Sequence, residues 1–426
     1  MCRWIGILSL FGACSTFYLV GSCLAVGPAA SGEVGGETPE GLDPALWKRA
    51  VKLTREALVA DTHCDTAFHF DRPGYRFDQR HDEGHVDLPR MRQGGVKLQV
   101  FAHYTPPDVQ GDAAVGDARE TLALMTKTLT AAGVTVARTP AELKSAVRRG
   151  RVAAILSLEN GNPLPPGRLD LLEEYHAAGV RALGLCHWRP NDLCDASTDN
   201  PRWNGLSPWG ETVVREMNRR GWMVDVSHLS DDSVRRILAI SAAPIMASHS
   251  DCRALNDIPR NLPDDLIRAI AAKGGLVGVN FSPAFLDADY LRQDDERLAR
   301  LQPQLEALEK QYGEDRRAYH RARRQLLATV PVKLPGVARL VDHIDHVVTV
   351  GGIDAVGLGS DFDGIGALPA PMESCADIPL VTCELLRRGY TERDVRKILG
   401  GNFLRFFESV TRAAAAPSTG KTKALD

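Results

Sequence analysis

The sequence lacks the features that proteins use to bind nucleic acid. It contains no run of lysine and arginine residues, and its 54 acidic residues outnumber its 51 basic residues, which leaves a formal net charge of −3 at pH 7. Nucleic-acid-binding domains usually carry a basic surface or stripe. We therefore expect no nucleic-acid partner. The chain is 44% hydrophobic and 25% charged, as is typical of a globular protein with a sizeable core.

Acidic residues are absent from the beginning of the chain. Arg3 is the only charged residue before Glu33, and residues 4–24 are apolar or small. This pattern predicts an export signal over residues 1–25. Residues 19–23, Leu-Val-Gly-Ser-Cys, resemble a bacterial lipoprotein signal in which Cys23 becomes the lipidated first residue. Ordinary cleavage near Ala25 and an uncleaved membrane anchor are the alternatives. We expect an exported protein of the cell envelope or periplasm, with Cys23 as the candidate lipid anchor to the membrane.

A cysteine framework is also missing. Beyond the signal, the cysteine spacings match neither a zinc ribbon nor a known disulfide scaffold. Cys186 with Cys194 and Cys375 with Cys383 are close in sequence and are candidate pairs. The alternative is that all remain buried free thiols. The six cysteines are Cys64, Cys186, Cys194, Cys252, Cys375 and Cys383.

Neither an internal repeat nor a second linker divides the chain after residue 44. Residues 26–44 are rich in glycine, alanine, proline and glutamate, which predicts a flexible linker. Residues 413–426 have the composition of a disordered tail. We therefore expect one large domain over residues 45–412.

Within this domain, eight short apolar runs alternate with amphipathic helical stretches. Each run has the length of a strand and is nearly continuous in apolar residues, as strands buried on both faces are. The alternation predicts an α/β fold, a closed parallel (β/α)8 barrel. An open doubly wound sheet is the alternative, but no glycine-rich dinucleotide fingerprint follows the first run. The runs are residues 58–60, 97–102, 153–158, 181–185, 223–226, 244–247, 276–281 and 355–358.

Residues 287–330 break the alternation. The segment is long and highly charged, and five of its apolar residues recur at spacings of three and four before Gly313 interrupts the pattern. We predict a helical hairpin inserted after the seventh strand. Its charges indicate a solvated face, and a lid or a dimer contact is the more specific interpretation. The apolar residues are Leu298, Leu301, Leu305, Leu308 and Tyr312.

Polar residues gather where the apolar runs end. His63 and Asp65 follow the first run at a spacing that places both side chains on one face of a strand. Glu159 ends the third run, where an unpaired carboxylate would be costly to bury unless cations lie nearby. Four further runs are followed by His187, His228, His249 and Asp361.

Taken singly, each of these residues has a structural alternative, such as a hydrogen-bonded pair or a salt bridge. Together they lie at the carboxyl ends of the strands of one barrel, where barrel enzymes have their active sites. Imidazole and carboxylate groups suit zinc, and two zinc ions would need a bridging carboxylate and about two further ligands each. The other histidines show no such grouping, and we expect surface or structural roles for them. They are His69, His81, His85, His103, His176, His320, His343 and His346.

Several motifs together resemble the renal (membrane) dipeptidase family of zinc metallopeptidases, in a bacterial form. The resemblance extends from about residue 59 to about residue 407. The motifs are DTHCD at residues 61–65, HVDLPR at 85–90, LENG at 158–161, YHAAGVR at 175–181, EMN at 216–218, DVSH at 225–228, SHS at 248–250, RN at 260–261, GSDFDG at 359–364 and GGNF at 400–403.

The resemblance implies a distorted (β/α)8 barrel that binds two zinc ions per chain. By this resemblance His63 and Asp65 hold one zinc ion, His228 and His249 hold the other, and Glu159 bridges the two.

The same resemblance implies catalytic and substrate-binding roles. His187 would polarise the scissile carbonyl and stabilise its oxyanion, and Asp361 would handle the proton of a metal-bridging hydroxide. Arg260 would hold the free carboxylate of a small dipeptide substrate. The family also implies a homodimer.

One position departs from the family pattern. The family usually has Glu-Gly-Gly at the bridging position, and this chain has Glu159-Asn160-Gly161. We expect Asn160 to narrow or repolarise the substrate pocket. The alternatives to a dipeptidase are another barrel amidohydrolase, with lactonase, β-lactam-hydrolysing or deaminase activity, and a non-catalytic zinc-binding surface protein. Amidohydrolases of that kind usually begin with H-x-H and often use a carboxylated lysine as the bridge, whereas the first strand here gives H-x-D.

Overall fold

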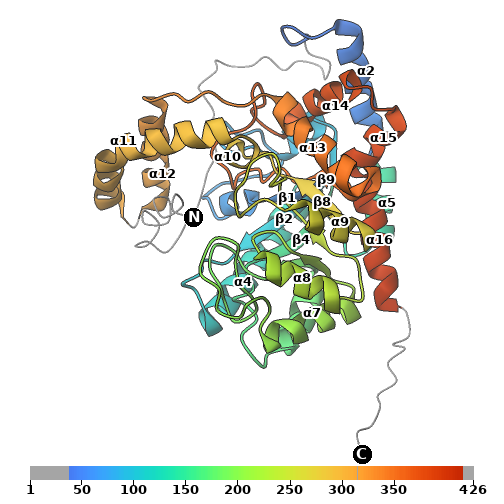
Figure 1. Ribbon diagram of the computed structural model, residues 1–426, viewed down its shortest axis with the longest axis vertical. Helices are drawn as coiled ribbons and strands as arrows, with labels where there is room; N and C mark the ends of the chain where they lie inside the picture. The colour runs from blue at the N-terminus through green and yellow to red at the C-terminus, as the bar shows by residue number, and fades with distance from the viewer. Residues whose placement is uncertain (1–37, 314, 416–426) are drawn as a thin grey trace, which may run out of the picture.

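The computed structural model describes residues 38–313 and 315–415. In this part of the chain eight parallel strands form a closed barrel surrounded by helices (Figure 1), which confirms the predicted fold. The strands follow one another around the barrel in chain order, and the pairing of β9 with β1 closes it, with Asp61 opposite Leu358. The barrel strands are β1 (Val59–Cys64), β2 (Val96–Tyr104), β4 (Ala153–Glu159), β5 (Val180–Gly184), β6 (Met223–Asp225), β7 (Met246–Ala247), β8 (Leu276–Val279) and β9 (Val356–Leu358).

A short strand that the sequence did not predict, β3 (Thr135–Val136), lies outside the barrel. It pairs with the first two residues of β4, Ala153 and Ala154. The barrel neighbour β5 pairs with β4 only from Leu156 onward, so this edge of β4 is free to bind another strand.

The helices begin and end at signals that the sequence contains. In α7, for example, the Ser207 side chain accepts the N–H of Gly210, Pro208 is the first helical residue, and Gly221 ends the helix with a φ of 74°. The helices between the strands are α3 (Leu88–Gln93), α4 (Gly111–Ala131), α5 (Pro140–Arg148), α6 (Asp170–Ala178), α7 (Pro208–Arg220), α8 (Asp231–Ile240), α9 (Asp264–Ala272) and α13 (Val337–Gly351). Those at the two ends of the domain are α2 (Pro44–Glu56), α14 (Ile378–Arg387), α15 (Glu392–Arg396) and α16 (Asn402–Ala415).

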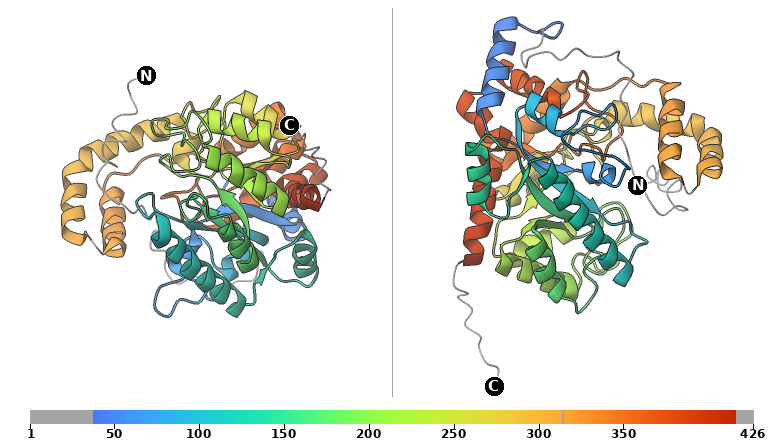
Figure 2. Two further views of the ribbon diagram at one scale, coloured as in Figure 1. Left: turned by 90° about the horizontal axis from the view of Figure 1, so that it is seen from below. Right: turned by 180° about the vertical axis from the view of Figure 1, so that it is seen from behind.

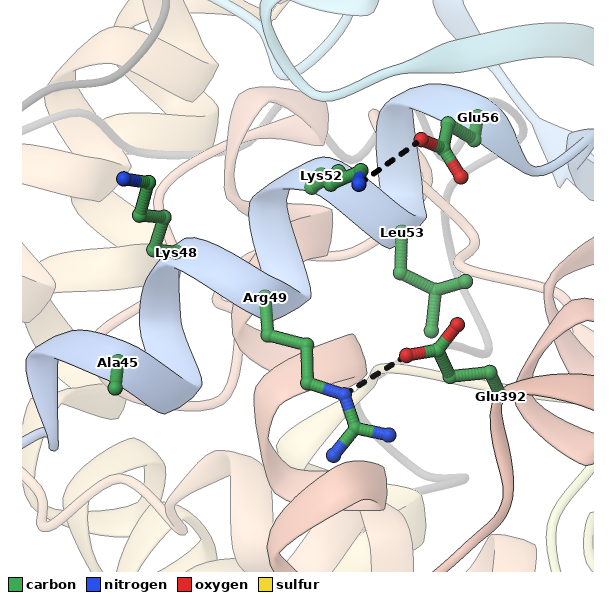
Figure 3. A pocket seen from close by; sticks show the side chains of 7 residues that line it. All are labelled: Ala45, Lys48, Arg49, Lys52, Leu53, Glu56 and Glu392. Carbon is green, nitrogen blue, oxygen red and sulfur yellow. Dashed lines mark hydrogen bonds and ion pairs between the residues drawn. The ribbon is translucent and has the colours of Figure 1, made fainter.

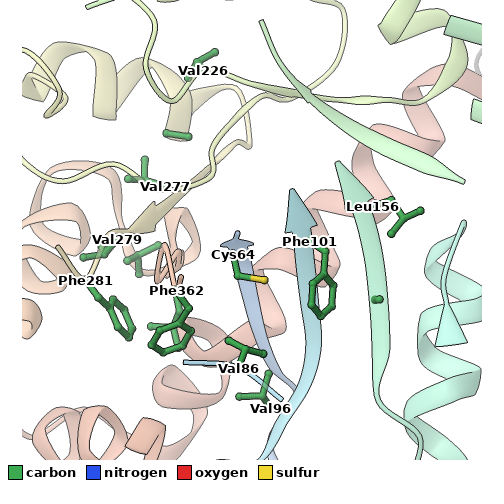
Figure 4. Packing of buried hydrophobic residues seen from close by; sticks show 14 of the residues in the cluster. Cys64, Val86, Val96, Phe101, Leu156, Val226, Val277, Val279, Phe281 and Phe362 are labelled. Carbon is green, nitrogen blue, oxygen red and sulfur yellow. The ribbon is translucent and has the colours of Figure 1, made fainter. Parts of the chain in front are cut away.

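Apolar side chains pack in two layers. The outer layer lies between strands and helices and includes Phe101, Phe281 and Phe362 (Figure 4). The inner layer fills the barrel near the start of the strands, for example with Leu98 and Ile155, and it includes four residues of α16: Phe403, Phe406, Phe407 and Val410. Helix α16 therefore closes the end of the barrel that lies opposite the carboxyl ends of the strands.

Two long helices occupy the segment after β8, following the short helix α10 (Pro283–Leu286). These helices, α11 (Ala288–Tyr312) and α12 (Arg316–Ala328), pack against each other and project from one side of the barrel (Figure 2). Leu301 and Leu305 are buried, whereas Leu298, Leu308 and Tyr312 are half-buried. The hairpin lies on the opposite side of the barrel from α16 (Figure 1).

The described residues cover only part of the predicted terminal segments. The export signal, Cys23 and most of the predicted linker lie outside the described residues, and so do residues 416–426. Helix α16 continues to Ala415, three residues into the predicted tail. Within residues 38–313 and 315–415, no helix combines the length and the apolar character that a membrane span requires.

The six cysteines in the described part of the chain are free and buried. The candidate pairs Cys186 with Cys194 and Cys375 with Cys383 are therefore not bonded in the structure, and the alternative of buried thiols is the one it contains. All six pack among apolar side chains of the outer layer.

Candidate active site

Four histidines converge on one carboxylate oxygen at the carboxyl ends of the strands. Their Nε2 atoms lie at 3.0 Å (His228), 3.5 Å (His249), 3.6 Å (His63) and 3.7 Å (His187) from Glu159 Oε1. All five side chains are largely buried, with at most 11% of any of them exposed. The barrel thus brings together residues from five strand ends that lie far apart in the sequence.

Two more carboxylates extend this cluster. The ligand atoms of His63, Asp65 and Asp361 lie within 4.8 Å of one another, and so do those of two further groups, His63–Glu159–His249 and Glu159–His187–His228. His63 and Glu159 each belong to two of these groups, so the three groups form one connected cluster of candidate metal ligands.

The donor atoms of the cluster fit metal ions. His63 Nε2 and Asp65 Oδ1 are buried without a hydrogen-bond partner. Buried polar atoms are rarely left in this way unless an ion or water satisfies them. Imidazole nitrogens and carboxylate oxygens are the ligands that zinc takes in catalytic sites.

The candidate metal-binding groups include two residues, His187 and Asp361, that the sequence did not predict as metal ligands. His187, expected only to contact substrate, lies within ligand distance of Glu159 and His228, and Asp361 lies within ligand distance of His63 and Asp65. The Nε2 atoms of His228 and His249 are 3.0 Å apart, so one ion could contact both.

Burial and charge adjust the protonation of these groups. Burial lowers the pKa of His187, His228 and His249 well below the usual value, so these imidazoles are neutral, the form that binds metal. Burial also lowers the pKa of His63, but the charges of Glu159 and Asp65 outweigh it and raise the pKa to about 10. Glu159 itself has a pKa raised by burial, which shows the cost of an anion here without cations.

The backbone at the site adopts conformations that side chains usually avoid. His228 has a φ of 71°, Asp361 of 61°, Asp363 of 68° and Asn160 of 77°. Each residue lies just past the end of a strand, where the chain turns sharply. Left-handed conformations of non-glycine residues are uncommon and cluster at functional sites.

A chain of hydrogen bonds orients His249. Its Nδ1 lies 2.7 Å from Ser248 Oγ, and that hydroxyl donates to Asp225 Oδ2 at 2.5 Å. The carboxylate and hydroxyl fix the ring so that Nε2 faces Glu159, as the outer partners of metal-binding histidines do. The sequence placed Asp225 and Ser248 in motifs but did not assign them this role.

Asp361 and Arg260 adjoin the four histidines and are held by hydrogen bonds. Asn280, whose role the sequence did not reveal, donates through Nδ2 to Asp361 Oδ2 at 2.9 Å. Burial raises the pKa of Asp361 to about 7, although the charge of His63 acts in the opposite direction. Arg260 is 3% exposed and donates to Ser250 Oγ and to the His249 carbonyl, while its Nε has no partner.

Asp363 lies in a different environment from Asp361. It accepts hydrogen bonds from Thr66 Oγ1 at 2.6 Å and from the His85 backbone N–H at 2.6 Å, and it lies 3.7 Å from His69 Nε2. Burial alone would raise the pKa of Asp363, but its contacts with His69 and His85 hold the pKa well below its usual range. His69 and His85, expected to be structural, thus join the segment after β1 to the loop after β9.

Asn160 does not line the pocket as predicted. Its side chain is buried, its Nδ2 donates to the Thr105 carbonyl at 2.7 Å, and its Oδ1 accepts from Asn191 Nδ2 at 2.9 Å. Both ends of the amide are therefore bonded to neighbouring loops, which leaves almost no surface to narrow or repolarise a cleft.

A cavity of about 270 Å3 lies beside the cluster. Phe68 and Tyr104 line it on the barrel side, and the Tyr104 ring lies 4.4 Å from that of His187. Arg321 and Arg324 line it from α12, so the predicted hairpin contributes a wall to this cavity, although none of the clustered histidines and carboxylates lines it.

A second hollow, of about 350 Å3, lies along α2 (Figure 3). It is lined by surface residues, among them Lys48, Arg49 and Lys52, and Arg49 is paired with Glu392 at 2.8 Å. None of the predicted site residues lines this hollow.

Comparison with known proteins finds dipeptidases among the relatives of this chain. The chain is 29% identical over 389 residues to dipeptidase verJ of Clonostachys rogersoniana, covering 87% of this chain and 88% of that one. It is 29% identical over 382 residues to dipeptidase 3 of Rattus norvegicus, covering 86% of this chain and 68% of that one.

Solved structures show the same relationship. The probable dipeptidase PvdM from Pseudomonas aeruginosa superposes with a TM-score of 0.73 at 29% identity, over 87% of this chain and 99% of that one. A metallopeptidase from Rhodobacter sphaeroides, liganded with a phosphinate mimic of the dipeptide L-Ala-D-Ala, superposes with a TM-score of 0.68 at 25% identity, over 83% of this chain and 99% of that one.

The profile of membrane dipeptidases, peptidase family M19, matches residues 47–420. With the barrel, the clustered metal ligands and these relatives, the match shows that this chain belongs to the membrane dipeptidase family and is a hydrolase of the metallodipeptidase type.

Proposed function

We propose that this protein is a zinc-dependent dipeptidase that binds two zinc ions per chain and hydrolyses the peptide bond of small dipeptides. The observation that carries the proposal is the convergence of four imidazole Nε2 atoms, within 3.0–3.7 Å, on one oxygen of Glu159. Histidines so arranged around a buried carboxylate are suited to hold metal ions.

The candidate ligands would divide between two ions, and Glu159 would contribute to both. His63 and Asp65 would hold one zinc ion, and His228 and His249 the other. Zinc bound here supplies a water of lowered pKa and polarises the scissile carbonyl.

The remaining side chains act on the substrate. His187 presents Nε2 toward Glu159 and would donate a hydrogen bond to the carbonyl oxygen as negative charge develops there. Asp361 would take a proton from the attacking water through its carboxylate and deliver it to the leaving amine. The Asn280 side chain, which donates to Asp361 Oδ2 at 2.9 Å, would hold the carboxylate in place for both steps.

Arg260 would set the length of the substrate. Its guanidinium is buried, lies over the Phe285 ring and has no carboxylate bonded to it among the described residues. A terminal carboxylate would complete this site with charge-assisted hydrogen bonds. A longer peptide has no carboxylate at that distance from the scissile bond, so the enzyme would be limited to dipeptides.

Location and assembly are part of the proposal. The N-terminal sequence supports export to the cell envelope with lipid attachment at Cys23, and the family resemblance supports a homodimer. The mass of the mature N-terminus tests the first expectation, and light scattering of the purified protein tests the second.

The decisive experiment measures turnover of a panel of L-L and L-D dipeptides together with metal content. The D-residue arm is included because the Rhodobacter sphaeroides relative binds a mimic of L-Ala-D-Ala. We expect about two zinc ions per chain and loss of turnover on chelation, restored by adding zinc. Active enzyme with one metal ion or none would contradict the proposal.

Glu159→Gln tests the bridge. Removing the shared negative charge should abolish binding of at least one ion and reduce turnover more than any other ligand change, because both ions lose a ligand. Metal analysis and dipeptide turnover of the variant measure this. Retention of two zinc ions with near-native turnover would remove Glu159 from the bridging role.

A further inference from the structure

One ring nitrogen of His187 has no hydrogen bond that could hold the imidazole in place. Within the described residues its Nδ1 is buried and has no hydrogen-bond partner. Its ring contacts those of Tyr104 and His228, with centroids at 4.4 Å and 4.0 Å. The position of His187 over Glu159 therefore depends on packing and on the backbone of the loop that follows β5.

Asn191 organises the backbone of that loop. Its Nδ2 donates to the Leu185 carbonyl at 2.7 Å, and its Oδ1 accepts the backbone N–H groups of Leu193 and Cys194 at 2.8 Å and 3.3 Å. The Trp203 indole N–H donates to the Asn191 carbonyl at 2.8 Å. One side chain thus binds both arms of the loop on either side of His187.

Asn160 connects this loop to the metal ligand Glu159. Its Oδ1 accepts from Asn191 Nδ2 at 2.9 Å, and its Nδ2 donates to the Thr105 carbonyl at 2.7 Å. The side chain is 2% exposed, and its backbone has a φ of 77°. A non-glycine residue in this conformation is strained, so its hydrogen bonds must offset the strain.

We infer that Asn160 is a positioning residue: through Asn191 it holds the His187 loop in a fixed place relative to Glu159. The inference rests on the proposed function of His187. A misplacement of about 1 Å can reduce the rate by up to about 10²-fold, so a link of this kind has a measurable effect on turnover.

Asn160→Gly is the primary variant, because glycine adopts the same backbone conformation without strain while both hydrogen bonds are lost. Asn162→Ala is the matched control. Asn162 bonds only to the carbonyls of the loop after β2, at Pro106, Pro107 and Val109, and not to the His187 loop. Both variants are examined alone and in combination with His187→Ala, for kcat, KM, metal content and affinity for a phosphinate dipeptide mimic.

For Asn160→Gly we expect kcat to fall about 10-fold, with KM and metal content near native. The phosphinate resembles the tetrahedral transition state, so its affinity should fall by the same factor. In the His187→Ala background the substitution should change nothing further, because the group it positions is gone. Asn162→Ala should retain native kinetics.

Several outcomes would overturn the inference. If the fold-reduction in kcat of the double variant equalled the product of the reductions in Asn160→Gly and His187→Ala, Asn160 would not act through His187. Loss of metal from Asn160→Gly would show that it acts on Glu159 instead. An equal effect of Asn162→Ala would reduce both residues to general support of the loops.

A second variant and a second measurement keep the inference testable if Asn160→Gly does not fold or if the protein hydrolyses no dipeptide. If Asn160→Gly fails to fold, Asn191→Asp breaks the link from the half-buried side. It still accepts from Leu193 and Cys194 but donates neither to Asn160 nor to the Leu185 carbonyl. Hydrogen exchange of residues 186–207 in metal-free protein should rise in either variant and not in Asn162→Ala. Unchanged exchange would refute the link even if the wild-type protein hydrolysed no dipeptide.

Discussion

A few atoms at the barrel mouth carry the chemistry. Glu159 Oε1 has four imidazole nitrogens around it, and Arg260 offers a buried cation without a carboxylate partner among the described residues. Because uncompensated buried charges are costly, both groups require partners that enter with metal or substrate. The cost of keeping such groups buried is consistent with a site built for binding rather than for stability.

Arg260→Ala should raise KM for dipeptides by about 10–100-fold, the scale of losing charge-assisted hydrogen bonds, and leave zinc content unchanged. Steady-state kinetics measure the change. Arg235→Ala is the control, because Arg235 is an exposed arginine paired with Asp265 at 2.7 Å. The native enzyme should also cleave C-terminally amidated dipeptides poorly, and equal rates for amide and free acid would remove Arg260 from the carboxylate site.

Asp361→Asn should keep both zinc ions and bind substrate almost normally while turnover falls by about 10²–10⁴-fold, the usual effect of losing a general acid–base group. Asp363→Asn is the comparison. Since Asp363 bonds to Thr66 and to the His85 backbone, that change should act mainly on stability, as thermal unfolding would show. If Asp361→Asn lost metal, Asp361 would be a ligand, and full turnover would leave it without a catalytic role.

At the scale of elements, the loops after β1 and β9 are packed so closely that a larger side chain does not fit between them at Gly364. The loop after β9 turns at Asp361 and Asp363, and an added Cβ at Gly364 would overlap Asp65 Oδ2 and Asp361 Oδ1. Glycine is therefore required there so that the loops after β1 and β9 can meet at the metal ligands.

Gly364→Ala should displace Asp65 or Asp361 and so reduce both zinc content and kcat/KM, the latter by about 10²-fold or more. Gly366→Ala is a matched control two residues away, because an added Cβ there meets no atom within 4 Å. Metal analysis and kinetics of the two variants give the comparison. Equal behaviour of the two would show that this loop is not rigidly packed against the site.

At the scale of the whole molecule, the barrel separates stability from chemistry. The metal ligands lie at the carboxyl ends of the strands, and α16 seals the opposite end with Phe403, Phe406 and Phe407. Helix α12 of the hairpin adds a wall to the cavity that Phe68 and Tyr104 line on the barrel side. Changes at the sealed end should therefore affect folding without affecting the reaction.

Phe406→Ala should lower the free energy of unfolding by about 3–5 kcal/mol, because the side chain is fully buried and leaves a cavity. Turnover per zinc-loaded, folded molecule should stay native. Arg412→Ala, on the exposed face of the same helix, should change neither property. Denaturant unfolding and active-site titration measure the two quantities, and a loss of turnover at native stability would contradict the separation.

The sequence by itself determined the eight strands and the residues at their ends, because both depend on local features: continuous apolar runs and the polar residue that follows each. It ended the first strand at Ala60, whereas β1 continues to Cys64. Those polar residues remain in the strand because neighbouring strands satisfy them: Ser360 donates to Asp61, and Thr62 donates to the Leu358 carbonyl.

Only the tertiary structure decided how the site residues are held. The bond from Asn280 to Asp361 spans 81 positions, and that from Asn160 to Thr105 spans 55. Such pairs have no local signature, since each partner follows a different strand and they meet only when those strands pair in the barrel. For the same reason the sequence assigned Asn160 to the pocket, while the fold bonds its side chain to two loops and turns it into a link between Glu159 and His187.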